Sequence, residues 1–103
     1  MVKRITWTLK AQQDRKEILR YWQVHNQSNI YSKKLNQLIK KALTLIAVHP
    51  HIGRRTNIET VRVKLVRDYL IFYEEAGEEI FILSIWDNRR NPDEISYQNH
   101  NKV

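Results

Sequence analysis

The sequence predicts a single α+β domain in which an antiparallel pair of helices packs on one face of a small, mainly antiparallel sheet. Two patterns carry this prediction. Apolar residues in the first half recur at the three- and four-residue spacing of helices, whereas in the second half they alternate with a period of two, as in strands. A length of 103 residues suits one domain with one modest core. The expected order is β-α-α-β-β-β within residues 1–103, with a polar tail at about residues 91–103.

The N-terminal strand is indicated by Ile5 and Trp7, which alternate with polar neighbours between residues 3 and 8. Thr8 then stands at the expected N-cap of a helix, because its hydroxyl can accept a hydrogen bond from a backbone N–H of the first turn. The helix predicted after it runs from about Leu9 to His25. Its apolar stripe consists of Ala11, Ile18, Tyr21, Trp22 and His25.

A second helix is predicted from Ile30 to Val48, after the polar run at residues 26–29 has ended the first helix and supplied a second cap. Because so few residues join the two helices, they should pack antiparallel. Pro50 and Gly53 end the helical half of the chain. The apolar face of the second helix consists of Tyr31, Leu35, Leu38, Ile39, Ala42, Leu45 and Ile46.

The second half predicts three strands, at residues 60–66, 69–74 and 80–86, joined by turns at residues 67–68 and 76–77. Strand parity carried through these turns places Tyr73 opposite Ile80 and divides the side chains between two faces. The face expected to receive the helices is apolar and consists of Val61, Val63, Leu65, Leu70, Phe72, Phe81, Leu83 and Ile85. The other face mixes cations with aromatic and aliphatic residues: Arg62, Lys64, Tyr69, Ile71, Tyr73, Ile80, Ile82, Ser84 and Trp86.

The chain is strongly basic, with a formal net charge of +7 and a pI of about 9.9. Residues 1–53 hold ten Lys or Arg against two acidic residues, whereas residues 54–103 hold eight against nine. Such an excess favours a polyanionic partner, which can be nucleic acid, the ribosome or an acidic protein segment. The lack of cysteine excludes disulfides and thiolate chemistry, and no apolar run is long enough to cross a bilayer. We therefore expect a cytoplasmic protein with no membrane partner.

No sequence motif indicates a metal or cofactor site. The four histidines lack the ligand spacing of a metal site, and the sequence contains no phosphate-binding loop, so neither a metal nor a cofactor is expected. The candidate residues are instead cations and aromatic rings, a combination that binds phosphates and stacks bases. Alternatively, the aromatic residues cover part of the sheet. The predicted nucleic-acid-binding residues are Arg54, Arg55, Arg67, Tyr73 and Trp86.

Five stretches of the chain, in order between about residues 3 and 92, resemble the RelE/ParE superfamily of bacterial toxins. The resemblance implies a growth-inhibiting toxin of a type II toxin–antitoxin system. It also implies a cognate antitoxin, whose acidic, partly disordered segment lies on the basic and apolar surface of the toxin. The five stretches are Ile5-Thr6-Trp7-Thr8, His49-Pro50-His51-Ile52-Gly53-Arg54, Val61-Arg62, Asp68-Tyr69-Leu70-Ile71-Phe72-Tyr73 and Asp87-Asn88-Arg89-Arg90-Asn91-Pro92.

The superfamily divides by target. RelE-like members cut mRNA in the ribosome with strand cations, later arginines and a tyrosine near the C-terminus. Leu70 stands where that branch carries a further arginine. ParE-like members poison DNA gyrase and need no nuclease site, and the long helical hairpin and the His-Pro-x-Ile-Gly-Arg stretch are similar to that branch. The catalytic residues that the RelE branch implies here are Arg62, Lys64, Arg89 or Arg90, and Tyr97.

Three hypotheses of function follow. The first is a ribosome-dependent mRNA interferase, a metal-independent endoribonuclease that inhibits translation. In it the strand cations and Arg89 or Arg90 hold the phosphates, while Tyr97 orients or protonates the reacting groups. The second is an inhibitor of DNA gyrase that acts through protein contacts. The third is an RNA- or protein-binding module without toxicity.

Overall fold

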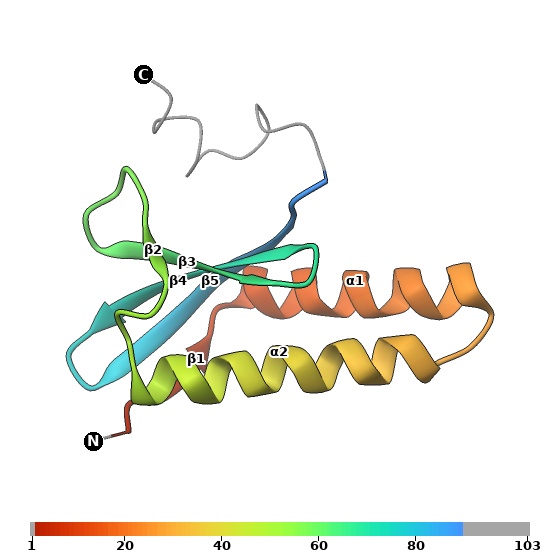
Figure 1. Ribbon diagram of the computed structural model, residues 1–103, viewed down its shortest axis with the longest axis horizontal. Coiled ribbons are helices and arrows are strands. Elements are labelled where there is room, and N and C mark those ends of the chain that lie inside the picture. The colour runs from red at the N-terminus through yellow and green to blue at the C-terminus, as the bar shows by residue number, and fades with distance from the viewer. Residues whose placement is uncertain (1, 90–103) are drawn as a thin grey trace.

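The computed structural model describes residues 2–89 and has the predicted α+β architecture, with two antiparallel helices lying against a sheet (Figure 1). The predicted element order is confirmed, and one short edge strand, β2, is added to it. The elements are β1 (Arg4–Trp7), α1 (Leu9–Asn26), α2 (Ile30–Val48), β2 (Arg54–Arg55), β3 (Val61–Val66), β4 (Tyr69–Ala76) and β5 (Glu79–Asp87).

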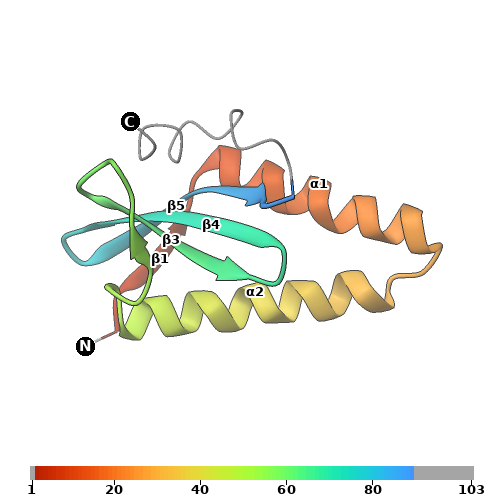
Figure 2. The same ribbon diagram turned by 45° about the horizontal axis from the view of Figure 1, so that its top comes forward.

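The sheet is mixed, with its five strands in the order β1-β5-β4-β3-β2. The N-terminal strand β1 runs parallel to β5, and all other neighbouring strands are antiparallel. The helical hairpin is longer than the part of the sheet that it covers, so the end with the α1–α2 loop projects past the strands (Figure 2). No helix in the described part of the chain is long and apolar enough to cross a membrane.

A hydroxyl group accepts a hydrogen bond at the start of each helix. The Oγ1 of Thr8 accepts a hydrogen bond from the N–H of Ala11 at 3.2 Å and donates one to the carbonyl oxygen of Ile82 at 2.7 Å. The cap therefore starts α1 and also ties this start to β5. The N-cap residue of α2, Asn29, makes no side-chain cap hydrogen bond, and the Oγ of Ser28 just before it accepts from the N–H of Ile30 at 3.2 Å.

The helices cover the face of the sheet that the sequence predicts to lie away from them. The predicted assignment of the two faces is therefore wrong. Val61, Val63, Leu70 and Phe72 form a second buried cluster on the other face. The prediction relied on the strict alternation of β3, because β4 and β5 are apolar on both faces and give no preference. The strand residues packed with the helices are Val66, Tyr69, Ile71, Tyr73, Ile80, Ile82 and Ile85.

The register between β4 and β5 also differs from the prediction. Ala76 pairs with Glu79, so the turn consists of Gly77 and Glu78, and Tyr73 lies opposite Ile82 instead of Ile80. Gly77 has a φ of +62°, a conformation that costs glycine little. A register shift between Phe72 and Tyr73 then changes which side chains at the end of β5 face the helices. Ile85 packs with the helices, and Trp86 packs on the other face.

Part of the predicted apolar stripe of α1 is not buried. Ala11 is fully buried and Ile18 and Trp22 are half-buried, whereas Tyr21 is 53% exposed and His25 is exposed. The reason is the length of the hairpin, because the last turns of α1 lie beyond the sheet. In α2 the prediction placed Leu45 in the core, but Leu45 is 40% exposed and Leu43 is buried.

Candidate functional site

Four predicted site residues gather at the β2–β3 side of the sheet, which we call the basic corner: Arg54, Arg55, Arg62 and Lys64. In the pairing of β2 with β3, Arg54 lies opposite Val63 and Arg55 lies opposite Arg62. Both residues of β2 are exposed, and the two β3 cations are half-buried. Arg67 lies apart from them, exposed in the β3–β4 turn with a φ of +57°.

Tyr73 holds the loop that leads into this corner. Its Oη donates a hydrogen bond to the carbonyl oxygen of Pro50 at 2.7 Å and accepts one from the N–H of Gly53 at 2.9 Å. Only 1% of the residue is exposed, and this burial raises the pKa of its hydroxyl. The expectation that the ring of Tyr73 lies on an open nucleic-acid-binding face is therefore contradicted, and the alternative that it covers the sheet holds.

Arg62 is engaged by backbone groups of the same loop. Its Nη1 donates to the carbonyl oxygens of Gly53 at 2.9 Å and His51 at 3.3 Å. The adjacent hollow, of about 250 Å³, is lined by acidic as well as basic side chains. Among them, Glu75 contacts Lys3 at 2.9 Å and His51 at 3.0 Å, and these partners, Lys3 foremost, lower the pKa of its carboxyl group. Arg62 is thus held by backbone carbonyl groups, and the carboxylates of Glu59 and Glu75 line the same hollow as Arg55 and Arg62.

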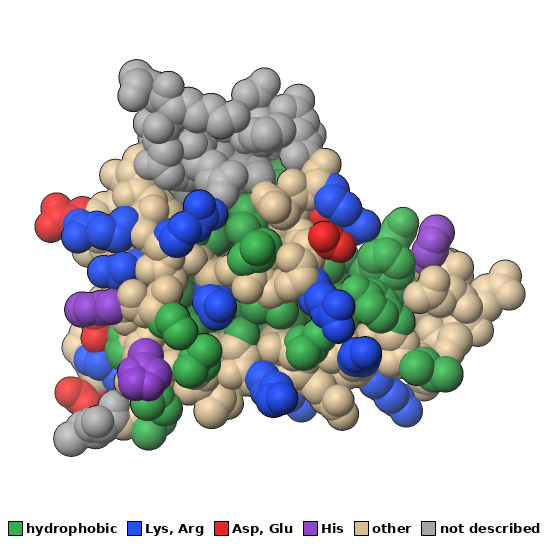
Figure 3. Space-filling view, viewed as in Figure 1, with side chains coloured by type: hydrophobic (Ala, Val, Ile, Leu, Met, Phe, Trp, Pro, Cys, Tyr) green, Lys and Arg blue, Asp and Glu red, His purple; other side chains and the backbone are tan. Residues whose placement is uncertain are grey.

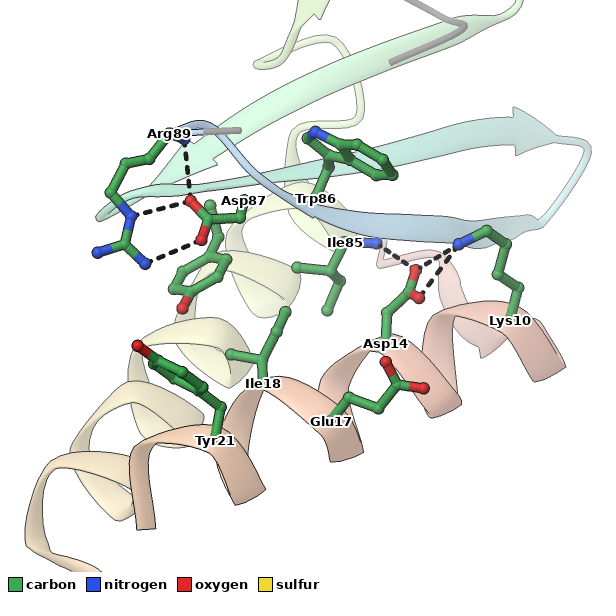
Figure 4. A pocket seen from close by; sticks show the side chains of 10 residues that line it. Lys10, Asp14, Glu17, Ile18, Tyr21, Ile85, Trp86, Asp87 and Arg89 are labelled. Carbon is green, nitrogen blue, oxygen red and sulfur yellow. Dashed lines mark hydrogen bonds and ion pairs between the residues drawn. The ribbon is translucent and has the colours of Figure 1, made fainter. Parts of the chain in front are cut away.

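Arg89 lies at the other end of the sheet, just after β5. Its Nε and Nη2 each donate to the carboxylate of Asp87 at 2.9 Å, which raises the pKa of the guanidinium (Figure 4). The guanidinium carbon also lies over the ring of Trp22, 5.6 Å from its centroid, and over Tyr69 at 6.0 Å. Trp22 in turn donates from Nε1 to the Oη of Tyr69 at 2.7 Å, and burial raises the pKa of Tyr69.

The described residues do not bring the predicted catalytic cations to one point. Val66 of β3, Tyr69 of β4 and Asp87 of β5 are paired across the sheet, and Arg89 follows Asp87 by two residues. Arg62 lies four residues before Val66 in β3. Its backbone is thus about 13 Å along the strands from the row of paired residues, and two strand spacings add about 10 Å across the sheet. Lys64 lies between the two ends. Arg90 and Tyr97 lie outside the described residues.

Two other predicted positions belong to the face away from the helices. Trp86 is half-buried and packs against the second cluster. Leu70, at the position where the RelE branch carries an arginine, is 2% exposed within that cluster. In the described part of the chain, no group of three or more acidic or histidine side chains is arranged to hold a metal ion.

The sequence did not single out the projecting end of the hairpin. Tyr21, Val24 and Ile30 are 53%, 68% and 77% exposed there, and we call these three residues the hairpin tip. Figure 3 shows hydrophobic side chains gathered toward this end and Lys and Arg side chains distributed along the helices. The available signal was the apolar stripe of α1, which is longer than the sheet can cover. A pocket of about 490 Å³ lies between α1 and the end of β5, and Tyr21 of the hairpin tip is among the residues that line it.

Comparisons with known proteins agree with this fold. Residues 5–92 match the family described as ParE toxin of type II toxin-antitoxin system, parDE. A chain in a solved structure of the chromosomal ParDE TA system from P. aeruginosa is similar in fold, with a TM-score of 0.73 and 22% sequence identity. The similarity covers 84% of this chain and 96% of that one. No curated protein matches the sequence.

Proposed function

The chain belongs to the family of ParE toxins of type II toxin–antitoxin systems, and from this membership we propose that it arrests growth by inhibiting DNA gyrase through protein contacts. In this proposal the toxin binds gyrase as a protein ligand and cuts no nucleic acid. The rival is the RelE-like activity, in which the same fold cleaves mRNA on the ribosome.

The hydrogen bonds and positions of Arg62 and Arg89 favour one of these two activities over the other. A metal-free ribonuclease needs cations close to one scissile phosphate. Arg62 is bonded to loop carbonyls, Arg89 is bonded to Asp87, and the two lie at opposite ends of the sheet. The buried Leu70 removes a further cation that the nuclease branch uses. These observations favour a function that does not need the cations to converge.

The helical hairpin supports a protein-binding function in its place. Residues 9–48 hold eight Lys or Arg against two acidic residues. At its projecting end, the hairpin tip presents aliphatic and aromatic side chains that gain little from contact with a phosphate backbone. An apolar patch on a hairpin with an excess of cations fits a protein surface with an acidic rim. We therefore place the gyrase contact at the hairpin tip.

A cognate antitoxin is the second partner in this proposal. The expected antitoxin segment is acidic, since the toxin carries a net charge of +7, and partly disordered before it binds. A salt dependence of the complex would follow from this charge complementarity. Binding of a synthetic acidic antitoxin segment that weakens as the salt concentration rises would support it, and binding indifferent to salt would contradict it.

The proposal is tested by induced expression of two sets of variants. Arg62→Ala with Arg89→Ala should leave growth arrest and the DNA-damage response intact, because neither side chain acts on a phosphate. Val24→Asp should reduce both, because it places a charge in the hairpin tip. Leu9→Asp is the matched control, since Leu9 is also an exposed aliphatic residue of α1, 71% exposed, but lies at the opposite end. Loss of toxicity in the double arginine variant, together with new mRNA ends in the wild type, would overturn the proposal in favour of the interferase.

A further inference from the structure

The pocket between α1 and the end of β5 is lined by residues of both elements. Its volume of about 490 Å³ is within the range of small-ligand sites. Ile18 of α1 and Ile85 of β5 line its interior together with the ring of Tyr69. Figure 4 shows side chains from the helix and from the strand converging on the space between them.

Two of the carboxylates that line the pocket are already engaged. Asp14 accepts a hydrogen bond from the N–H of Ile85 at 3.0 Å and an ion pair from Lys10 at 3.0 Å. The strand β1 ends at Trp7, opposite Ile82, so the carboxylate of Asp14 takes the place that a strand partner of Ile85 would fill. Asp87 is held by the guanidinium of Arg89. Asp14 and Asp87 therefore line the pocket with carboxylates that are already bonded within the protein.

Glu17 differs from both. It is exposed on α1, lines the pocket, and has no ion-pair partner among the described residues. One turn further along α1, the ring of Tyr21 lines the same pocket and is 53% exposed, and it is also stacked with the ring of His25 at 5.4 Å between centroids. The two cations that line the pocket, Lys10 and Arg89, are paired with Asp14 and Asp87, so within the described part of the chain the pocket keeps one carboxylate without an ion-pair partner and one half-exposed aromatic ring.

We propose that this pocket binds the guanidinium group of an arginine side chain from a protein partner, with Glu17 as its counter-charge and Tyr21 as its stacking surface. A guanidinium combines planar stacking on an aromatic ring with hydrogen bonds to a carboxylate, whereas an ammonium group is more strongly hydrated and does not stack. The protein already uses this contact internally, since Arg15 lies 4.3 Å from the centroid of the Trp7 ring and Arg89 lies over Trp22. This inference does not depend on which macromolecule the toxin inhibits.

The test is a titration of the isotope-labelled toxin with the capped tripeptide acetyl-Gly-Arg-Gly-amide, followed by NMR. The amide signals of Glu17, Tyr21 and Ile85 should shift together, with a dissociation constant in the millimolar range. In the Glu17→Gln variant, binding should weaken about three- to fivefold, the effect of one exposed ion pair. Glu59→Gln is the matched control, because Glu59 lines the separate hollow beside the basic corner, and loss of its negative charge should leave binding unchanged.

Two further peptides make the proposal specific. Citrulline in place of arginine removes the charge and keeps the shape, and lysine keeps the charge and removes the planar group. Both should bind more weakly than the arginine peptide. Equal binding of all three peptides, shifts centred away from the pocket, or equal binding to the Glu17→Gln variant would each overturn the assignment. Because the altered side chains are exposed, we expect each variant to remain folded, and its amide spectrum checks this.

Discussion

The substitution Gly53→Ala tests the contact that holds the loop before the basic corner. A Cβ at this position would lie 2.6 Å from the Oη of Tyr73, 2.8 Å from its Cε1 and 2.9 Å from the carbonyl oxygen of Val63. All three distances are shorter than normal van der Waals contacts. Since backbone lies on one side and a buried ring on the other, the added methyl group can be accommodated only if the loop or the ring moves.

The expected cost combines two terms. Overpacking a dense interior costs about 1–3 kcal/mol. Displacement of Tyr73 also weakens its hydrogen bonds with Gly53 and Pro50, which contribute about 1 kcal/mol each. The lower entropy of the unfolded alanine chain offsets about 0.4–1 kcal/mol of this loss. We expect the free energy of unfolding to fall by about 2–4 kcal/mol.

The other glycine of the chain provides the comparison. Gly77 has a φ of +62°, and a Cβ added there would meet nothing within 4 Å. Gly77→Ala should therefore cost about 1–2 kcal/mol, from backbone strain alone. Urea denaturation followed by circular dichroism measures both losses at an unchanged m-value. Tyr73→Phe removes the nearest clashing atom, so its cost and that of Gly53→Ala should not add in the double variant. A Gly53→Ala loss no larger than that of Gly77→Ala would refute the steric reasoning.

Three further predictions concern stability. Asp14→Ala leaves the N–H of Ile85 without its charged acceptor and should lower the free energy of unfolding by about 2 kcal/mol in chemical denaturation; an unchanged midpoint would show that this tether contributes nothing. Burial raises the pKa values of Tyr69 and Tyr73 above 10, so the unfolded state loses these protons first and stability should fall as the pH rises through about 10 and beyond. Phenolate absorbance should show ionisation that continues above pH 10, and completion of the ionisation by that pH would contradict this burial. The pKa of Glu75 is lowered below 4.5, so its contribution is present above that pH and is lost as the pH falls further. Glu75→Gln should flatten this acid-side loss in a pH series of thermal melts, and an unaltered series would exclude the ion pairs as its cause.

The element order could be predicted from the sequence because each signal is local. Thr8 marks the start of α1, the polar run at residues 26–29 separates the helices, and the change of period from 3.6 to 2 marks the sheet. The β3–β4 register could also be predicted, since the two-residue turn at Arg67 and Asp68 fixes the pairing of Val66 with Tyr69. These features depend on neighbours in the sequence and not on the packing of distant elements.

The assignment of the faces could not be predicted in this way. In β4 and β5 both faces are apolar, so hydrophobicity does not say which face the helices cover. The turn at Gly77 and Glu78 and the shift near Tyr73 each moved the register, and neither has a unique signature in the sequence. The hydroxyl of Tyr73 therefore bonds the loop at Pro50 and Gly53, where the sequence had suggested a residue that stacks on bases.

The sequence predicts which types of residue form the candidate site, but it does not predict how these residues are arranged in space. Arg62 and Arg89 were chosen as cations, but their partners, the loop carbonyls and Asp87, are set by tertiary structure. Glu17 and Tyr21 gave no motif, because a single carboxylate and a single ring one turn apart on a helix are common in solvent-exposed positions. Only the position of α1 beside the end of β5 gives this pair a pocket.

We proposed that this toxin of the ParE family inhibits DNA gyrase without nuclease chemistry, and a gyrase supercoiling assay with the purified chain tests this most directly. We expect inhibition that rises with toxin concentration, that persists in the Arg62→Ala, Arg89→Ala variant, and that weakens in Val24→Asp but not in Leu9→Asp. Undiminished supercoiling at a toxin concentration that cleaves mRNA on translating ribosomes would contradict it.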